Sequence, residues 1–502
     1  MKVSGLGKFS LGQAVPNKDH AVCVSLPTVK DLIGYEEKKP ETIKSLKSGY
    51  PRFVQHRFIK DLIEVENKTN DLGQNNSSIF ANIENCQRAI DHFSLVDYQI
   101  KEKDRYSILH TSTFQEANSV KSFLQHTGAS ISSRLAEDIL IKKGILYTRE
   151  NVSPHENPDL FARNKIAEVH GEGVSPENVI ISSSGANAFY SLFYNTHKFF
   201  AKKKRKIWIQ LGWLYLDTIE TIKLFCKEDE IIFISKPSDL KAISYTFKKF
   251  GDQIAGVVTE FPTNPLLQSC DLQQIKELCG RIGSILIVDP TMASPKNSKV
   301  VKFADIIVNS LTKYASWEGD LMIGSLVFPA HSEIGKALFN DIKNMVSRPF
   351  KADLNRLCEQ LPFYSNFVKR TNQSLLQVVE FLISSDLVKK VFWSYQECSK
   401  EFFRLRAGDN NPGCVTSFEI KGSFEKFYNR LLMLKSPSFG TEFSLCCPYV
   451  YLAHYNLMKS KSGKALLKEA GISPNLCRLS VGLENPQDII DTLKEALVYA
   501  AK

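Results

Sequence analysis

Short runs of apolar and β-branched residues alternate with amphipathic stretches in the middle of the chain. Runs of this length and composition predict buried β-strands, while the stretch 272–282, where apolar residues return at helical spacing, predicts a helix. Seven strands are expected, at residues 178–183, 206–211, 230–235, 254–260, 284–289, 305–310 and 321–328. Alternation of strand and helix predicts an α/β fold with a mostly parallel central sheet. The close spacing of the last strands predicts antiparallel insertions there.

The same patterns divide the chain into three parts. Residues 1–135 form an N-terminal extension, in which the polar stretch 67–80 is predicted to be a loop or linker. Residues 136–345 form a large α/β domain, and residues 346–502 form a smaller C-terminal α+β domain. The elements predicted in the smaller domain are a long helix around 363–384, strands at 414–420 and 478–482, and a final helix that begins near Pro486.

Composition restricts the class of protein. With 43% hydrophobic and 11% aromatic residues, the 502-residue chain can bury a large core, which excludes wholesale disorder. The net charge of +10 is spread along the chain apart from the short basic run 202–205, so nucleic acid is not an expected partner. None of the eleven cysteines forms a Cys-x-x-Cys pair, so we expect reduced thiols and no metal site. A cytoplasmic protein that does not bind membranes is expected, because neither a signal peptide nor a membrane-spanning apolar run is present.

Residues that carry chemistry stand where two predicted strands end. Asp289 ends one of them, and Lys313 follows the next, preceded by Ser310 and Thr312. A carboxylate at such an edge can pair with a pyridinium nitrogen, and a lysine there can form a Schiff base while hydroxyls bind a phosphate. Each residue alone is also typical of an ordinary loop. Their combination predicts a site for pyridoxal 5'-phosphate (PLP), with Lys313 as its point of attachment.

A turn of small residues, Gly185 and Ala186 among them, follows the predicted strand 178–183 and precedes a predicted helix. Such a turn exposes backbone N–H groups, and a helix N-terminus adds a favourable dipole for an anion. Turns of this kind are also common for structural reasons alone. This one therefore supports a phosphate site only together with the lysine and the carboxylate.

From about residue 140 onward the sequence resembles the cystathionine γ-synthase group of the Cys/Met-metabolism PLP enzymes, which have the fold type I PLP-dependent transferase fold. The resemblance rests on the stretches YTREN…NP (147 to 158), SSSGANA, TEFPTNPLL, VDPTMASP, NSLTKY, SFEIKG, SPSFGTE and RLSVGLE. The N-terminal extension resembles the longer, fungal-type cystathionine γ-synthases through HAVCVSLPT, IGYEE, SGYPRF and HTGASISSRLAE. This narrower resemblance favours a synthase.

The resemblance implies a role for each matching residue. Lys313 would hold PLP and move the proton, and Asp289 would pair with the ring nitrogen. Arg478 would bind the substrate carboxylate through a two-pronged salt bridge, for which a planar guanidinium is well suited. Ser438 and Asn264 fall where the family places groups that contact the carboxylate or the cofactor. The residues implied to hold the phosphate are Gly185, Ala186, Ser310 and Thr312.

Tyr147 and Arg149 match the family's Tyr-x-Arg, which reaches the phosphate of the neighbouring subunit. The resemblance therefore implies a homodimer or homotetramer whose active sites draw residues from two chains. The expected substrates are small amino acids.

The sequence departs from the family at positions that flank the substrate. The ring-stacking tyrosine usually stands in Tyr-Gly-Gly-Thr, and its best counterpart is Tyr215, which Leu-Asp-Thr follows; Trp213 is the alternative. Pro290 replaces the asparagine that usually follows the aspartate, and Trp317 and Glu318 stand at an altered place after the lysine. These changes bear on the reaction more than on the cofactor.

Four residues with reactive side chains are not assigned to the site. His126 and His454 stand among apolar or small neighbours, and Cys446 and Cys447 are adjacent. We expect core or supporting roles for the histidines and buried packing for the cysteines.

The expected reaction is a γ-substitution that joins an O-acylhomoserine and cysteine to give cystathionine, a trans-sulfuration step of methionine biosynthesis. Once the substrate amine has displaced Lys313, the lysine would remove the α-proton and help the β-proton to leave. The cysteine thiol would then take the place of the γ-oxygen.

Two kinds of alternative stay open. An O-acylhomoserine sulfhydrylase and a cystathionine or methionine lyase share the same anchoring residues. Outside the enzyme class, a PLP-binding protein without turnover is the alternative. The joint presence of Lys313, Asp289 and Arg478 argues against it.

Overall fold

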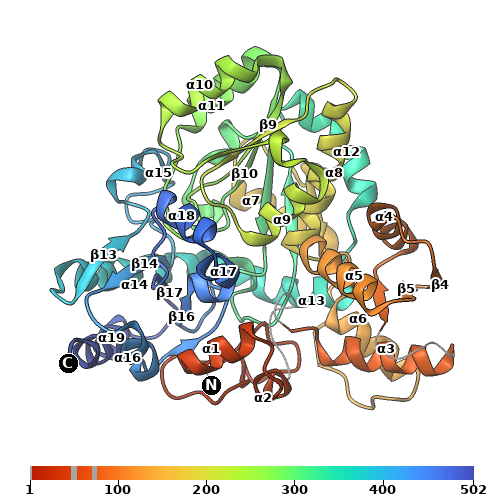
Figure 1. Ribbon diagram of the computed structural model, residues 1–502, viewed down its shortest axis with the longest axis horizontal. Coiled ribbons are helices and arrows are strands. Elements are labelled where there is room, and N and C mark those ends of the chain that lie inside the picture. Colours follow the sequence, from red (N-terminus) through yellow and green to blue (C-terminus); the bar gives the residue numbers. More distant parts are fainter. Residues whose placement is uncertain (1–2, 47–53, 71–75) are drawn as a thin grey trace.

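The computed structural model describes residues 3–46, 54–70 and 76–502, so the stretch SGYPRF lies outside the described part. A seven-stranded sheet forms its centre (Figure 1). In sheet order the strands are β6 (Val179–Ser182), β12 (Gly324–Val327), β11 (Ile306–Ser310), β10 (Ile285–Asp289), β9 (Ile254–Glu260), β7 (Ile207–Leu211) and β8 (Ile231–Ile234). All are parallel except β12, which is antiparallel to both neighbours. The predicted α/β fold is confirmed, and so is the antiparallel insertion.

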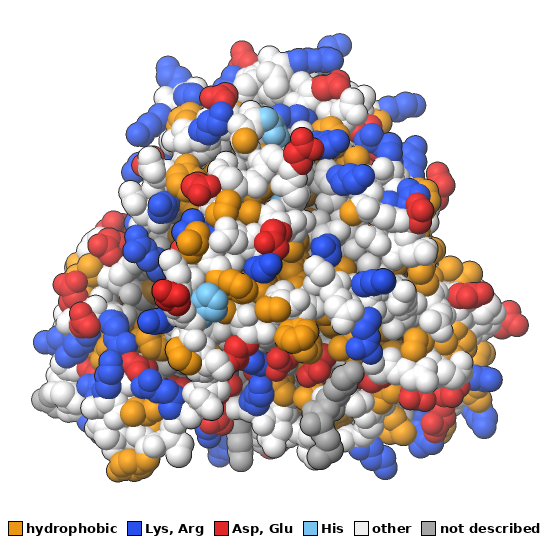
Figure 2. Space-filling model, turned by 180° about the vertical axis from the view of Figure 1, so that it is seen from behind, with side chains coloured by type: hydrophobic (Ala, Val, Ile, Leu, Met, Phe, Trp, Pro, Cys, Tyr) orange, Lys and Arg blue, Asp and Glu red, His pale blue; other side chains and the backbone are white. Residues whose placement is uncertain are grey.

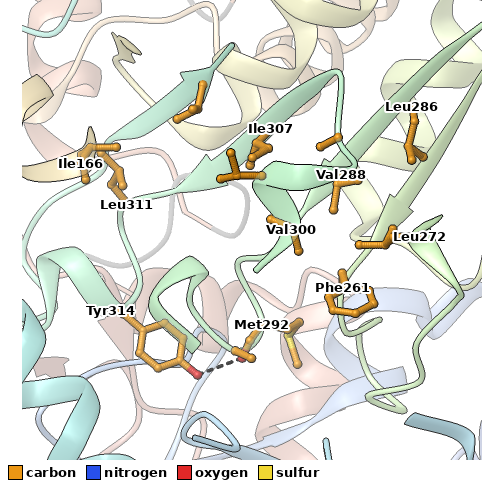
Figure 3. Close-up of a cluster of buried hydrophobic side chains, with 14 of the residues drawn as sticks. Ile166, Phe261, Leu272, Leu286, Val288, Met292, Val300, Ile307, Leu311 and Tyr314 are labelled. Carbon is orange, nitrogen blue, oxygen red and sulfur yellow. Dashed lines mark hydrogen bonds between the residues drawn. The ribbon is translucent and has the colours of Figure 1, made fainter. Parts of the chain in front are cut away.

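Helices cover both faces of this sheet, which explains why its strands are apolar on both sides. One face packs on α8 (Gly185–Ala201), α9 (Leu216–Phe225) and α12 (Glu333–Met345). The other packs on α7 (Pro158–His170), α10 (Leu240–Phe250), α11 (Leu272–Ile282) and α13 (Lys351–Gln360). Figure 3 shows part of the second core, where Val288 of β10 lies in register with Ile307 of β11.

A smaller five-stranded sheet, blue in Figure 1, lies beside the large one. Its order is β13 (Val388–Phe392), β14 (Val415–Ile420), β17 (Cys477–Ser480), β16 (Leu445–Pro448) and β15 (Leu434–Lys435). The helices of this unit are α16 (Phe424–Arg430), α17 (Tyr449–Lys459), α18 (Lys461–Glu469) and α19 (Pro486–Ala501), whereas α15 (Lys400–Arg404) packs its Phe402 into a core of the large sheet. We predicted β14, β17 and α19. The other strands were not predicted, because they are short or interrupted by lysines.

Helix α14 (Tyr364–Ser384) belongs to both packing units. Its first turns, with Phe367 and Val368, pack into a core of the large sheet. Its last turns, with Leu375 and Val379, pack into the core of the smaller unit. The long helix predicted around 363–384 is therefore confirmed, and it joins the two units.

The first described part of the N-terminal extension packs on the C-terminal unit. Its elements are β1 (Ala14–Val15), β2 (Cys23–Val24), α1 (Val29–Glu36) and α2 (Pro40–Ser45). Helix α1 lies beside α16 and α17 (Figure 1), and its Leu32 is completely buried in the core that includes α19. Tyr428 and Lys435 hold the preceding turn by donating hydrogen bonds to the carbonyls of Leu26 and Pro27, both at 2.8 Å.

The rest of the extension forms a small α/β unit beside the large sheet. Its antiparallel strands have the order β3 (Ser77–Phe80), β5 (Tyr106–Thr111) and β4 (Tyr98–Lys103). Its helices are α3 (Arg57–Thr69), α4 (Ile83–Phe93), α5 (Phe114–Thr127) and α6 (Ser133–Lys142). Helix α5 packs against α8 and α9, and α6 runs across the boundary that we placed between residues 135 and 136.

The prediction of a loop at residues 67–80 is wrong at both ends of the stretch. Residues 67–69 are the last turn of α3, and Ser77 begins the buried strand β3, while residues 71–75 lie outside the described part. The polar side chains are satisfied by one another, because Ser77 Oγ donates to Asn67 Oδ1 at 2.6 Å in the interior. A polar composition therefore did not mean a solvated loop at either end.

Basic and acidic side chains are interspersed over the face shown in Figure 2. No helix in the described part of the chain is both long and apolar enough to cross a bilayer. All eleven cysteines are free thiols, and ten of them are buried.

Leu32→Ala should lower the free energy of unfolding by about 2–5 kcal/mol, because it leaves a cavity in a core that the extension shares with the C-terminal unit. Lys30→Ala, at an exposed position of the same helix, should change that free energy by less than about 0.5 kcal/mol. Urea denaturation measures both. Equal effects of the two substitutions would contradict the view that α1 is part of the core.

Candidate active site

A cleft forms where the carboxyl ends of β9, β10 and β11 face the smaller unit. These strands are adjacent and parallel, so their last residues meet at one edge of the sheet. Glu260 ends β9 in register with Asp289, which ends β10, and Ser310 ends β11. The opposite wall comes from the loop 437–439 and from α17. The space between them is about 730 Å³, open solvent at its mouth included.

Lys313 projects into this cleft from the loop that follows β11 and is only 7% exposed. Its Nζ donates a hydrogen bond to Ser438 Oγ at 3.0 Å. The centroid of the Phe439 ring lies 5.2 Å from the same atom. The amine is thus held between the end of the large sheet and a loop of the smaller unit.

Tyr314 anchors the loop that carries this lysine. Its hydroxyl donates to the carbonyl of Met292 at 2.9 Å (Figure 3) and accepts from the N–H of Cys414 at 3.0 Å. Burial raises the pKa of the phenol well above its usual value, so it keeps the proton that it donates. One residue after Lys313, the backbone is therefore tied to both packing units.

Two neighbouring carboxyl groups dominate the electrostatics of the sheet edge. Burial raises the pKa of Asp289 to about 6, although Thr291 lowers it by donating hydrogen bonds, one of them from its N–H at 2.8 Å. Burial and then the charge of Asp289 raise the pKa of Glu260 well above its usual range. Glu260 accepts hydrogen bonds from the N–H groups of Tyr215 at 2.5 Å and Asn264 at 2.9 Å. A cation beside Asp289 would therefore be stabilised strongly.

The start of α8 and the end of β11 fit a phosphate group. Ser310 Oγ is buried and has no hydrogen-bond partner among the described residues. A Cβ added to Gly185 would lie 2.9 Å from Ser310 Cβ, so a side chain does not fit where the helix approaches the strand end. Ser184 caps α8 by accepting the N–H of Asn187 at 3.0 Å. An unpaired hydroxyl beside a helix N-terminus suits a phosphate ester, as Asp289 and Lys313 suit the ring nitrogen and aldehyde of PLP.

Arg478 reaches the same cleft from β17 and is 6% exposed. It donates to Asn264 Oδ1 and to the carbonyl of Ser438, both at 2.9 Å. Its guanidinium lies 5.0 Å and 5.7 Å from the ring centroids of Phe439 and Tyr449. Its Nε is buried and has no hydrogen-bond partner within the described part of the chain. A buried guanidinium whose Nε–H donor is not used is suited to bind a carboxylate.

Most of the predicted site residues meet in this cleft. Its lining includes Tyr215, Asn264, Asp289, Ser310, Lys313, Ser438 and Arg478. Gly185 lies against Ser310, and Ala186 lines a neighbouring cleft beside α8. Thr312 does not line the cleft, and its hydroxyl donates to the carbonyl of Ile323 at 3.1 Å and accepts from the same residue's N–H at 2.9 Å.

Tyr147 and Arg149 lie on the loop between α6 and α7 and do not line the cleft of their own chain. Tyr147 is 89% exposed, and Arg149 forms an ion pair with Asp138. Trp213, the alternative stacking residue, also lies outside the cleft, since its indole N–H donates to His454 Nε2 at 3.0 Å.

Glu260 and an apolar wall were not predicted. Glu260 ends a parallel strand just as Asp289 does, so the same rule could have identified it. The wall residues follow no sequence pattern, because they come from separate segments of the chain. They are Leu216, Met292, Pro437, Phe439, Cys447, Tyr449, Leu452 and Ala453.

A lysine, an acid and a phosphate cradle that converge at the carboxyl edge of this sheet define a PLP-dependent enzyme of fold type I. Solved structures show the same fold. Cystathionine γ-synthase from Xanthomonas oryzae pv. oryzae matches with a TM-score of 0.58 at 22% identity, over 69% of this chain and 86% of that one. Cystathionine γ-lyase from Lactobacillus plantarum matches with a TM-score of 0.57 at 19% identity, over 70% and 91%.

The chain belongs to the Cys/Met metabolism PLP-dependent enzyme family, whose profile matches residues 106–498. It is 29% identical to L-2-amino-4-chloropent-4-enoate dechlorinase/desaturase of Streptantibioticus cattleyicolor, over 96% of this chain and 97% of that one. It is 24% identical to cystathionine γ-synthase of Neurospora crassa, over 98% of both chains. The resemblance to fungal synthases over the whole length, extension included, is confirmed.

The raised pKa of Asp289 predicts how stability changes with pH in the PLP-free protein. Its folded pKa of about 6 exceeds the unfolded value near 3.9, so the folded state binds more protons between these values and stability falls as pH rises through this window. Asp289→Asn should remove this decrease in stability with rising pH. The stability advantage of the variant, measured by urea denaturation, should grow from about pH 4 to 6 and then level off. An advantage independent of pH would contradict the assigned pKa.

Proposed function

We propose that this enzyme catalyses a γ-substitution that joins an O-acylhomoserine and cysteine to give cystathionine. The observation that carries the proposal is the link between Lys313 and Arg478 through one residue. Ser438 accepts from Lys313 Nζ with its hydroxyl and from Arg478 with its carbonyl. A substrate whose carboxylate lies on Arg478 therefore presents its α-carbon to the lysine. Similarity to the Neurospora crassa synthase over the whole chain, extension included, supports the same reaction.

The residues that would hold PLP are those of the strand ends and of α8. Ser310 and the first turn of α8 would bind the phosphate, Asp289 would pair with the ring nitrogen, Tyr215 would stack on the ring, and Lys313 would be the attachment point. When bound, PLP supplies an electron sink that makes the α- and β-protons of the substrate acidic.

The side chains of the protein bind the substrate, transfer its α-proton and exclude water. Arg478 binds the α-carboxylate and fixes the orientation of the substrate. Lys313 Nζ takes the α-proton and returns it at the end, and the nearby Ser438 hydroxyl holds the amine in place between these steps. The apolar wall that includes Leu452 and Phe439 excludes water from the γ-carbon, so that the thiol rather than water adds there.

The proposal includes a homodimer or a homotetramer in the cytoplasm. In it, Tyr147 and Arg149 of one chain reach the phosphate held by another. Tyr147 is 89% exposed and is therefore accessible to a second chain, as this arrangement requires. The cleft beside Ala186 offers a place for a second chain next to α8.

A second candidate is an elimination from an amino acid with a small neutral substituent. The dechlorinase/desaturase relative is more similar in sequence than the synthase, at 29% against 24% identity. Among the described residues that line the cleft, Lys313 and Arg478 are the only cations, and both already have roles. An uncharged side chain suits the remaining apolar wall. Sulfhydrylase and lyase reactions use the same anchors and are separated from the synthase reaction by their products.

Arg478→Ala should lower the turnover of O-acylhomoserine by roughly 30-fold or more, because truncating one partner of a buried charge pair costs about 2–5 kcal/mol. PLP should stay bound, because Arg478 contacts the substrate. Lys313→Ala is the matched comparison, which should lose both activity and PLP that borohydride can fix to the chain. Covalent trapping of PLP by the Lys313 variant would refute the attachment point.

Competition between cysteine and sulfide at equal concentrations, with O-acylhomoserine as the common substrate, tests the reaction itself. Cystathionine should be the main product by mass spectrometry. Homocysteine as the main product would make the enzyme a sulfhydrylase. If 2-oxobutanoate and ammonia dominate although cysteine is abundant, the enzyme is a lyase, and release of chloride from a chlorinated amino acid would favour the second candidate.

A further inference from the structure

An apolar rim separates the cleft from an outer groove. Leu216 of α9 and Leu452 and Ala453 of α17 line both spaces. The groove continues outward between α9, β8 and α17. A group beyond the γ-carbon that points toward the groove therefore meets these three side chains.

Helix α17 is not regular where it forms this rim. His454, next to Ala453, has φ −141° and ψ 34° and is the one residue of α17 with non-helical angles. A break of this kind removes helical hydrogen bonds, so it persists only when surrounding contacts hold it. The position of Leu452 and Ala453 therefore depends on whatever holds His454.

A buried hydrogen bond from the large sheet holds it. Trp213, on the loop after β7, donates its indole N–H to His454 Nε2 at 3.0 Å, and the two rings meet edge to face at 5.0 Å. Trp213 is 5% exposed and His454 7% exposed. Because Nε2 accepts this bond, the imidazole is neutral and carries its proton on Nδ1.

The same imidazole connects the rim to the carboxylate site. The hydroxyl of Tyr449 lies 3.4 Å from His454 Nε2, and the Tyr449 ring lies beside the guanidinium of Arg478. At its other end, Trp213 stands two residues before Tyr215. The bond between Trp213 and His454 thus joins the loop that precedes Tyr215 to the turn of α17 that carries Leu452 and Ala453.

We propose that Trp213 and His454 are a positioning pair that sets how closely this rim approaches the substrate and so selects substrates by the size of the group beyond the γ-carbon. The inference rests on the proposed function only in that the cleft binds amino acids on PLP. The rim closes around small groups when α17 is held against Leu216. Loss of the bond lets the turn at Leu452 and Ala453 move away, which admits larger groups.

Two amino acids without a leaving group test this in the PLP-bound enzyme. Glycine does not reach the rim, whereas 2-amino-6-phenylhexanoic acid, whose side chain is carbon throughout, must place its ring there. Their dissociation constants are measured from the absorbance change of bound PLP. Trp213→Phe and His454→Leu should each tighten binding of the phenylhexanoic acid by about tenfold and leave that of glycine within about twofold.

The controls separate positioning from general damage. His454→Gln keeps an acceptor for the indole N–H and should stay close to wild type. Tyr451→Phe removes a hydroxyl on the side of α17 that stacks on Phe424 and should have no effect on either ligand. The double variant of Trp213 and His454 should be no different from either single one, because both remove the same bond.

The inference would be overturned if the dissociation constants of both ligands shifted equally, or if that of the larger ligand did not change. So would an effect of His454→Gln as large as that of His454→Leu. Failure of the proposed reaction is detected separately, by the products formed from O-acylhomoserine and cysteine, since these binding measurements involve no turnover.

Discussion

The adjacency of three parallel strands is the constraint on which the rest of the site depends. Neighbouring strands lie about 4.8 Å apart, so the residues that end β9, β10 and β11 lie close together. Glu260, Asp289 and Ser310 are therefore forced together, and two acids share one buried edge. Two raised pKa values follow, and the site is thereby poised to gain from a cationic ring nitrogen placed beside it.

The parts of the site that sequence predicted are those that local rules determine. Asp289, Ser310 and Lys313 follow strands that their apolar runs identify, and strand ends are where ligands collect. Arg478 and Ser438 come from other segments of the smaller unit, so no spacing rule brings them to the lysine. Only the resemblance to a family indicated them. Their approach to Lys313 depends on how the two units pack.

Tertiary contacts add what a motif cannot reveal. The assignment of Thr312 to the phosphate stays a prediction, and in the structure its hydroxyl donates to the carbonyl of Ile323 and accepts from the N–H of that residue. The extension was expected to contain a linker because Asn and Ser favour turns. Burial and a bond between Asn67 and Ser77 made these residues part of a helix and a strand instead. Tertiary packing overrode local preference at both places.

Helix α14 limits how the enzyme can move. Because one rigid helix supplies side chains to the cores on either side, the smaller unit cannot swing as a separate body without pulling Phe367 or Leu375 out of its core. Exposing even one such side chain costs about 1.5–3 kcal/mol. This cost favours small sliding movements of elements such as α17 over a swing of the whole smaller unit. Cutting the chain within α14 would leave neither fragment with a complete interior.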